Sequence, residues 1–177
     1  VIGNVSTDLF PQEPNAVYAG AAFSCARTRT GRAMCWGHND RGQTGQESNE
    51  SVRPVGFVVD NDGGIVLFGV RQLSLGSASA CARLVDGSLW CWGDNSYRLI
   101  NDPDAQRLLT ATPRLDLGRE VRSVAVGDGH ACVLRDNHTI WCFGRADSGQ
   151  VGPNGNREFC TDMVTRCLPA ATQVSRL

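Results

Sequence analysis

Lysine is absent from the sequence, so all seventeen basic residues are arginine. A compositional bias of the genome is the preferred interpretation, and contact surfaces that use planar guanidinium groups are the alternative. The basic residues form no run that could follow the phosphates of a nucleic acid, so we expect no nucleic-acid partner. No apolar run approaches the roughly 20 residues that cross a bilayer, so we expect no membrane span. A net charge of -1 excludes few other classes of partner.

Glycine and cysteine, in contrast, recur in a regular pattern. Three segments carry two cysteines with nine residues between them, followed by an aromatic residue and a glycine: Cys25 to Gly37, Cys81 to Gly93 and Cys132 to Gly144. Each first cysteine follows a glycine five residues earlier, namely Gly20, Gly76 and Gly127. A repeat of about fifty residues that carries one supersecondary unit is typical of solenoids, propellers and arrays.

The segment between each pair of cysteines predicts a β-hairpin with a three-residue turn. Such a turn commonly ends in a left-handed residue, and Gly31 and Gly87 occupy that position in the first two copies. The third copy places His138 there, which a residue of this class tolerates. In this register the two cysteines of each pair face one another at a separation that a disulfide can span.

Eight cysteines therefore predict four disulfides. The expected pairs are Cys25 with Cys35, Cys81 with Cys91, Cys132 with Cys142, and Cys160 with Cys167. A clamp between two helices is disfavoured by the glycines and turn residues, and zinc sites use shorter spacings with histidines nearby. Disulfides at this density favour an oxidising compartment, so we expect a secreted, extracellular or cell-surface protein.

Each repeat also supplies a strand before the hairpin and a strand after it that is marked by proline. The latter strands are expected at Pro54–Val59, Pro113–Leu117 and Pro169–Leu177. The sequence thus predicts an all-β fold made of propeller blades, each with four antiparallel strands and about three in number. The boundaries are 1–16 for the tail of a preceding repeat and a loop, 17–59 for repeat 1, 60–117 for repeat 2, and 118–177 for repeat 3 with a following edge strand.

The pattern Gly-x4-Cys-Ala, then Cys-Trp-Gly-x4-Gly-Gln-x-Gly and a proline strand, resembles the regulator of chromosome condensation repeat family. It is most similar to the cysteine-paired form of these repeats in secreted bacterial proteins. The resemblance implies a β-propeller of about seven blades, so this chain is expected to be part of a longer propeller or a unit that associates with copies of itself. The second copy departs from the motif with Arg98, Leu99 and Asn101, and we expect its loop to have a different conformation.

No constellation of residues points to catalysis, a metal or a cofactor. His38, His130 and His138 occupy different places in the repeat, so they predict no shared cluster. The run from Asp60 to Gly64 begins like a calcium loop but lacks the later ligands, which favours a tight turn. Trp36, Trp92 and Phe143 follow the second cysteine of each copy, and we interpret them as aromatics that pack between blades.

The sequence favours a non-catalytic extracellular module that binds another protein through the loops after the hairpins. The loops expected to do this are Gly37–Asn49, Gly93–Leu108 and Gly144–Arg166, because they vary while the hairpins do not. Two alternatives remain: a building block of a self-associating extracellular assembly, and a protein inhibitor of a secreted enzyme. Nucleotide exchange on a small GTPase, implied by the family's founding member, conflicts with an oxidising compartment.

Overall fold

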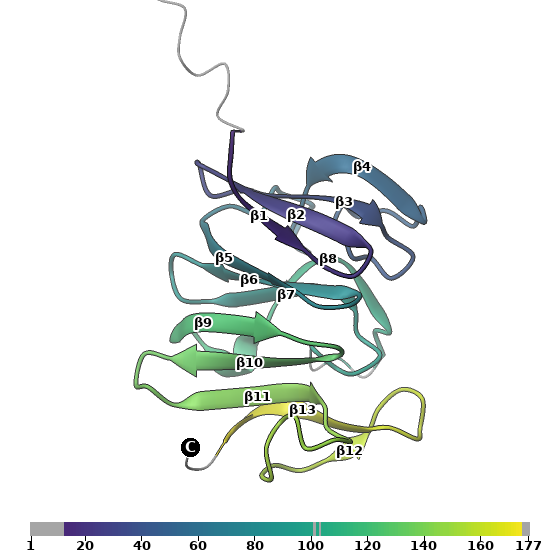
Figure 1. The fold of residues 1–177 in the computed structure, drawn as a ribbon, viewed down its shortest axis with the longest axis vertical. Helices are drawn as coiled ribbons and strands as arrows, with labels where there is room; N and C mark the ends of the chain where they lie inside the picture. Colours follow the sequence, from purple (N-terminus) through teal and green to yellow (C-terminus); the bar gives the residue numbers. More distant parts are fainter. Residues whose placement is uncertain (1–12, 101, 103, 175–177) are drawn as a thin grey trace, which may run out of the picture.

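Three antiparallel sheets lie one above the other along the longest axis of the molecule (Figure 1). The computed structural model describes residues 13–100, 102 and 104–174. This arrangement confirms the predicted all-β fold with about three blades of four strands. The first twelve residues of the expected tail of a preceding repeat, and residues 175–177 of the last expected strand, lie outside the described residues.

The strands of each sheet follow one another in space as they do along the chain, with one addition in the third sheet. The first sheet contains β1 (Pro14–Ala19), β2 (Phe23–Thr28), β3 (Ala33–His38) and β4 (Val52–Phe57). The second contains β5 (Val70–Leu75), β6 (Ser79–Leu84), β7 (Leu89–Asp94) and β8 (Arg107–Pro113). The third contains β9 (Val121–Val126), β10 (His130–Arg135), β11 (Ile140–Arg145) and β13 (Arg166–Gln173), and the short β12 (Glu158–Phe159) pairs with β13 at its edge.

The three predicted hairpins are present with the predicted turn. Gly31, Gly87 and His138 end the turns in the left-handed region, with φ of 77°, 80° and 64°. Each sheet therefore has a tight hairpin at its centre, and the same backbone conformation is used whether glycine or histidine occupies the position.

Four disulfides join the cysteines. Three link directly opposed residues of neighbouring strands with Cα atoms 4.1 Å apart: Cys25–Cys35, Cys81–Cys91 and Cys132–Cys142. Cys160–Cys167 closes a loop in the third repeat, with Cα atoms 5.2 Å apart. No cysteine is free. Each sheet is therefore closed covalently on itself rather than linked to its neighbour.

The prediction of an outer strand at Pro113–Leu117 in the second repeat is wrong. Pro113 ends β8 instead of opening a strand, and Leu115–Leu117 forms a short 3-10 helix, η2. The chain turns here because Arg114 and Leu117 are both buried, which an extended edge strand running outward would not allow. Similarly, Pro169 lies within β13, which begins at Arg166.

Two of the repeated glycines, Gly20 and Gly76, lie where successive sheets approach closely. A Cβ atom at Gly20 would lie 2.8 Å from the carbonyl oxygen of Gly76, and one at Gly76 would lie 2.2 Å from that of Gly127. Such distances leave no room for a side chain at Gly20 or Gly76. Next to Gly76, the side chains of Gln72 and Ser74 in β5 hydrogen-bond to the backbone of β9. Within the described part of the chain, no helix is long and apolar enough to cross a membrane.

Candidate interaction surfaces

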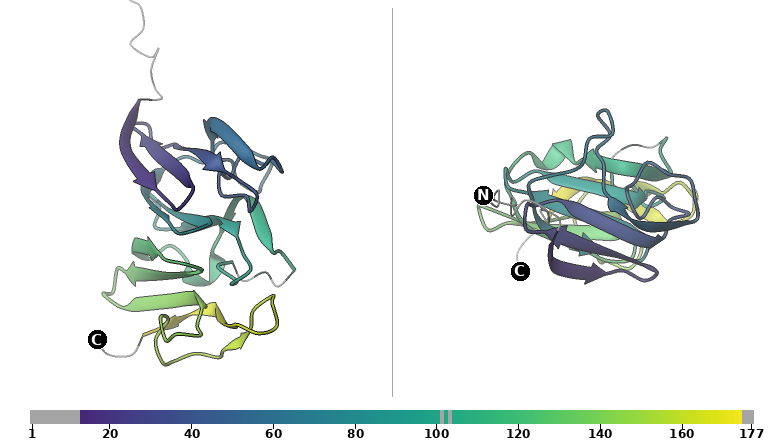
Figure 2. Two further views of the ribbon diagram at one scale, coloured as in Figure 1. Left: turned by 45° about the vertical axis from the view of Figure 1, so that its right-hand side comes forward. Right: turned by 90° about the horizontal axis from the view of Figure 1, so that it is seen from above.

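The loops after the hairpins all leave the sheets at one end. They connect β3 to β4, β7 to β8 and β11 to β13, whereas the hairpin turns lie at the opposite end of the same strands. The two further views show the loops as longer excursions beyond the stacked sheets (Figure 2). The expected binding segments Gly37–Asn49, Gly93–Leu108 and Gly144–Arg166 therefore share one side of the molecule, although residues 101 and 103 of the second are outside the described part.

A buried asparagine holds the first loop. The Asn39 side-chain amide donates to the carbonyl oxygens of Ser48 and Glu50, at 3.0 and 2.9 Å, and its oxygen accepts from the backbone and hydroxyl of Thr44. This one side chain ties the beginning of the loop to its end. The loop is therefore a rigid structure and not a free connection.

The second loop is built in the same way, which corrects the expectation of a different conformation. Asn95 donates to the carbonyl oxygens of Asp102 and Ala105 and accepts from the backbone of Ile100. Arg98 has a φ of 56° where the first repeat has Gly42 at 81°. Loss of the glycine motif therefore leaves the frame intact because the asparagine, which the motif does not include, is kept.

The first loop also takes part in the contact between the first two sheets, where it meets Trp92 of β7. The indole nitrogen of Trp92 donates to the carbonyl oxygen of Gln43, at 2.9 Å, and its ring lies against Gly45 and Val58. Trp92 is buried, as expected for an aromatic residue that packs between blades. A knob from the second sheet thus fills a socket in the first.

The next contact uses different residues for the same task. Phe143 takes the place of Trp92 and has no donor, and Arg114 takes the place of Val58. The Arg114 guanidinium lies over the Phe143 ring, 4.1 Å from its centre, and donates to the carbonyl oxygen of Leu99, which is the counterpart of Gln43. The carbonyl oxygen at this position of the loop therefore accepts a hydrogen bond from tryptophan in the first contact and from arginine in the second.

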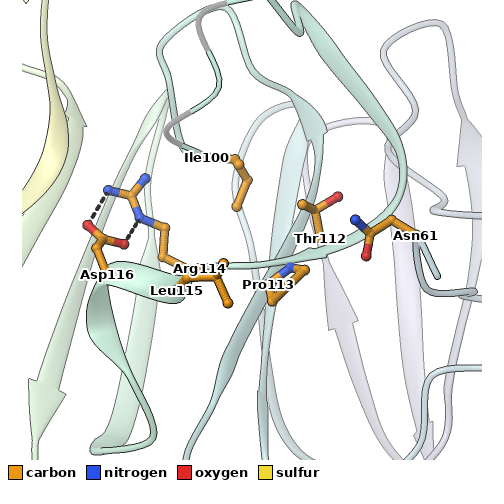
Figure 3. Close-up of a pocket in the computed structure, with 7 residues that line it drawn as sticks. All are labelled: Asn61, Ile100, Thr112, Pro113, Arg114, Leu115 and Asp116. Atoms are coloured by element: carbon orange, nitrogen blue, oxygen red, sulfur yellow. Dashed lines mark hydrogen bonds and ion pairs between the residues drawn. The ribbon is translucent and has the colours of Figure 1, made fainter.

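Arg114 is a buried charge with several partners. Its guanidinium pairs with both oxygens of Asp116, at 2.7 and 3.0 Å (Figure 3), and also donates to the carbonyl oxygen of Pro169. Asp116 in turn accepts from the backbone of Ala171, at 2.9 Å. Burial lowers the pKa of Arg114, whereas the hydrogen bonds and charge of Arg114 hold the pKa of Asp116 below its ordinary value despite partial burial. The pair therefore fastens the second sheet to the outer strand of the third.

A pocket of about 410 Å³ lies beside this pair. Its lining includes Ile100, Pro113, Leu115 and the Arg114–Asp116 pair (Figure 3). The donors of Arg114 are already used within the protein, so the pocket offers an apolar wall and a satisfied ion pair. It holds no nucleophile with a neighbouring base, which acyl-transfer chemistry of the serine or cysteine type requires.

The other polar residues considered in the sequence lie apart. His38 ends β3, His130 begins β10 and His138 lies in the third hairpin turn. The Asp60 side chain accepts hydrogen bonds from the backbone N–H groups of Asp62 and Ile65, as is typical of a tight turn. Across residues 13–100, 102 and 104–174, no three histidine, cysteine or acidic side chains are grouped so that they could hold a metal ion.

The third loop carries a small ring closed by the Cys160–Cys167 disulfide. Asp162 accepts hydrogen bonds from the backbone of Val164 and Thr165, which fixes the tip of the ring. Met163 and Val164 stand at this tip with 72% and 79% of their surface exposed. The ring therefore presents two large apolar side chains to solvent on a covalently closed frame.

Sequence reasoning found the loops but missed Asn39, Asn95 and Arg114. The two asparagines do have a signal, since each lies four residues after the second cysteine of its copy. Arg114 has no such signal in the sequence. Its role depends on the third repeat, which has Phe143 at the position where the second repeat has Trp92.

Comparison with known proteins agrees with this repeat structure. The family model "Regulator of chromosome condensation (RCC1) repeat" matches residues 15–43, 70–98 and 121–150. Human E3 ubiquitin-protein ligase HERC2 is 30% identical over 146 residues, which are 80% of this chain and 3% of that protein. Human Regulator of chromosome condensation is 24% identical over 147 residues, which are 80% of this chain and 33% of that protein.

Solved structures show the same fold. The crystal structure of Prp20p from Saccharomyces cerevisiae, described with its binding to Gsp1p and histones, superposes with a TM-score of 0.73 at 18% identity. The match covers 92% of this chain and 38% of Prp20p. The chain thus spans a small part of its curated relatives and little more than a third of the propeller it resembles. Its three matched repeats and its three stacked four-stranded units place it in the regulator of chromosome condensation repeat family.

Proposed function

We propose that the chain is a non-catalytic protein-interaction module that works in an extracellular setting and binds its partner with the ring at 160–167. The observation that carries this is the exposure of Met163 and Val164 at the tip of a ring closed by a disulfide. The disulfide and the turn hold the backbone of the tip, so little backbone entropy is lost on binding, and covering exposed apolar surface is favourable. The relatives of this family, such as Prp20p, also include proteins that bind other proteins.

The extracellular setting is supported by the cysteines. Four disulfides and no free thiol suit an oxidising compartment, because cytosolic reductants keep such pairs open. The absence of a catalytic or metal constellation in the described residues fits a binding role, although fold alone never decides function.

Capture from the extracellular fraction of the source tests this proposal. The oxidised chain is immobilised, and the proteins it retains are compared with those retained by Met163→Asp and Val164→Asp. Leu115→Asp is the matched control, since Leu115 is 82% exposed and lies in η2, which is not part of the ring. We expect a partner whose capture falls at least about tenfold with either ring variant, as loss of a buried apolar anchor predicts, and is unchanged in the control.

Partners retained equally by the ring variants and the wild type contradict the proposed binding site. A partner that is a single soluble enzyme, inhibited by the wild type alone, identifies the protein as an inhibitor that uses the same ring.

Self-association is a second candidate function because the two ends of the stack are complementary. Trp36 occupies in the first sheet the position that Trp92 and Phe143 occupy in the other two. Unlike them, it is only partly buried. At the other end, the three atoms nearest to a Cβ atom at Gly152 would all belong to Val174, whereas those nearest to a Cβ atom at Gly45 belong to Val58 and Trp92. The last described sheet thus has the valine and glycine of a tryptophan socket without the tryptophan.

Trp36→Ala tests this second candidate. If copies associate end to end through Trp36, the variant is expected to remain monomeric at concentrations where the wild type forms larger species, because loss of a buried tryptophan commonly costs several kcal/mol at an interface. Light scattering of the purified oxidised chain measures the difference. Equal mass for both proteins at every concentration contradicts self-association through Trp36.

A further inference from the structure

Three arginines surround a hollow on the side of the sheets that carries the hairpin turns. This arginine hollow has a volume of about 210 Å³, and Arg27, Arg29 and Arg71 contribute to its lining with the turn residue Gly31. Arg29 lies 3.4 Å from Glu13 and both side chains are exposed, so that pair is weak. Within the described part of the chain, Arg27 and Arg71 form no ion pair.

Arg27 also has a buried donor without an acceptor. Its Nε atom is inaccessible to solvent and makes no hydrogen bond. Arg83 occupies the equivalent place in the second sheet, and its Nε donates to the carbonyl oxygen of Val121, at 2.7 Å. A buried donor without a partner is unfavourable, and the Arg27 Nε atom has no acceptor such as the one that the Arg83 Nε atom has.

An apolar hollow of about 330 Å³ adjoins the arginine hollow, and Gly69 and Val85 line both. Phe68 and Trp90 contribute to the apolar hollow, and Phe68 is 68% exposed. An aromatic side chain left in solvent beside a hollow is typical of a surface that a partner covers.

Two acidic residues complete the arrangement. Asp60 and Asp86 line the apolar hollow but not the arginine hollow. Asp86 lies 3.4 Å from the exposed Arg119, and the hydroxyl of Ser88 is the main cause of a pKa below its ordinary value, so Asp86 remains ionised at neutral pH. The surface thus has positive charge in one hollow, and apolar and negative groups in the next.

We propose that the two hollows form one binding site for an extended segment of a partner protein in which an acidic side chain lies beside a large apolar one. The carboxylate accepts hydrogen bonds from Arg27 and Arg71, and guanidinium–carboxylate bonds are among the strongest in proteins. The apolar side chain covers Phe68 and Val85. A basic residue beyond it faces Asp60 and Asp86. This site lies at the end of the strands opposite the 160–167 ring, so it is independent of the proposed function.

The chemistry favours a protein segment over a sulfated or phosphorylated polymer. A polyanion satisfies the three arginines, but its further charges meet Asp60 and Asp86 and leave the apolar hollow uncovered. A segment with one acidic, one apolar and one basic residue in order complements every part of the surface.

Fluorescence anisotropy with a labelled peptide tests the site on the full oxidised chain. The probe peptide is Asp-Glu-Leu-Phe-Gly-Arg, and the comparison peptide, Arg-Arg-Leu-Phe-Gly-Asp, has the charges reversed. We expect Arg71→Glu to weaken binding of the probe about tenfold or more, because it replaces attraction with repulsion, and Phe68→Ser to weaken it about fivefold. Arg71 and Phe68 are exposed, so both variants are expected to fold, and unchanged thermal unfolding checks this.

Met163→Asp is the matched control and is expected to bind the probe as the wild type does, so failure of this site and failure of the 160–167 ring are distinguishable. Equal binding of the two peptides overturns the proposal. So does an absence of any effect from Arg71→Glu, or binding of heparin that depends on Arg71 while the probe peptide does not bind.

Discussion

Replacing Arg114 with alanine is expected to lower the free energy of unfolding by about 3–5 kcal/mol, the usual result of removing one partner of a buried ion pair. The variant leaves the carboxylate of Asp116 without its partner and the carbonyl oxygens of Leu99 and Pro169 without their donor. It also removes the group that covers the Phe143 ring. Chemical denaturation followed by tryptophan fluorescence measures the loss.

A double variant shows whether the loss comes from this particular contact. Arg114→Val with Phe143→Trp rebuilds the valine and tryptophan that join the first two sheets, and it restores a donor for the Leu99 carbonyl. We expect the double variant to recover about half or more of the stability lost by Arg114→Val alone, as coupled neighbours in one contact do. Additive losses from the two changes contradict the equivalence of the two contacts.

The same pair gives stability a pH dependence. Because the pKa of Asp116 is lowered in the folded protein, the pair stabilises the fold fully above the ordinary aspartate range, and the contribution is lost as the pH falls through the lowered pKa. The difference in stability between wild type and Arg114→Ala is therefore expected to be constant near neutral pH and to shrink below about pH 4. Denaturation curves at several pH values measure this difference.

The sequence predicts the parts of the fold that each repeat decides by itself. The hairpin turns at Gly31, Gly87 and His138 follow from spacing and from local backbone preference. The glycines at positions 20, 76 and 127 are visible in the sequence as a repeat, but the sequence alone does not show why glycine is required there. Gly20 and Gly76 leave room for a backbone carbonyl of the next sheet, a contact that no single repeat contains, whereas Gly127 leaves room for the His130 side chain of its own sheet.

The candidate surfaces were harder to predict for the same reason. Asn39 and Asn95 hold their loops by bonding to backbone carbonyls, so the sequence of the loop can change while its frame stays, as Arg98 in place of glycine illustrates. Arg114 acts across two repeats. The two hollows with Arg71 and Phe68 bring together the linker before β5 and two separate hairpins, an association that only the stacking of sheets creates.

Reduction of the four disulfides is expected to unfold the chain at 25 °C. Each hairpin disulfide closes a loop with a sequence separation of 10, which in the chain-entropy model stabilises the fold by about 2–3 kcal/mol. Four such contributions together approach the 5–15 kcal/mol that is typical of a whole domain, so little stability remains without them. Far-UV circular dichroism in the presence and absence of reductant measures the change, and mass mapping of the oxidised chain establishes the pairs. The double variant Cys81→Ala with Cys91→Ala, which removes the central disulfide alone, is expected to lose about 2–3 kcal/mol and to remain folded. A fully reduced chain with an unchanged spectrum, or a disulfide that joins two different sheets, contradicts a fold in which each sheet is closed on itself.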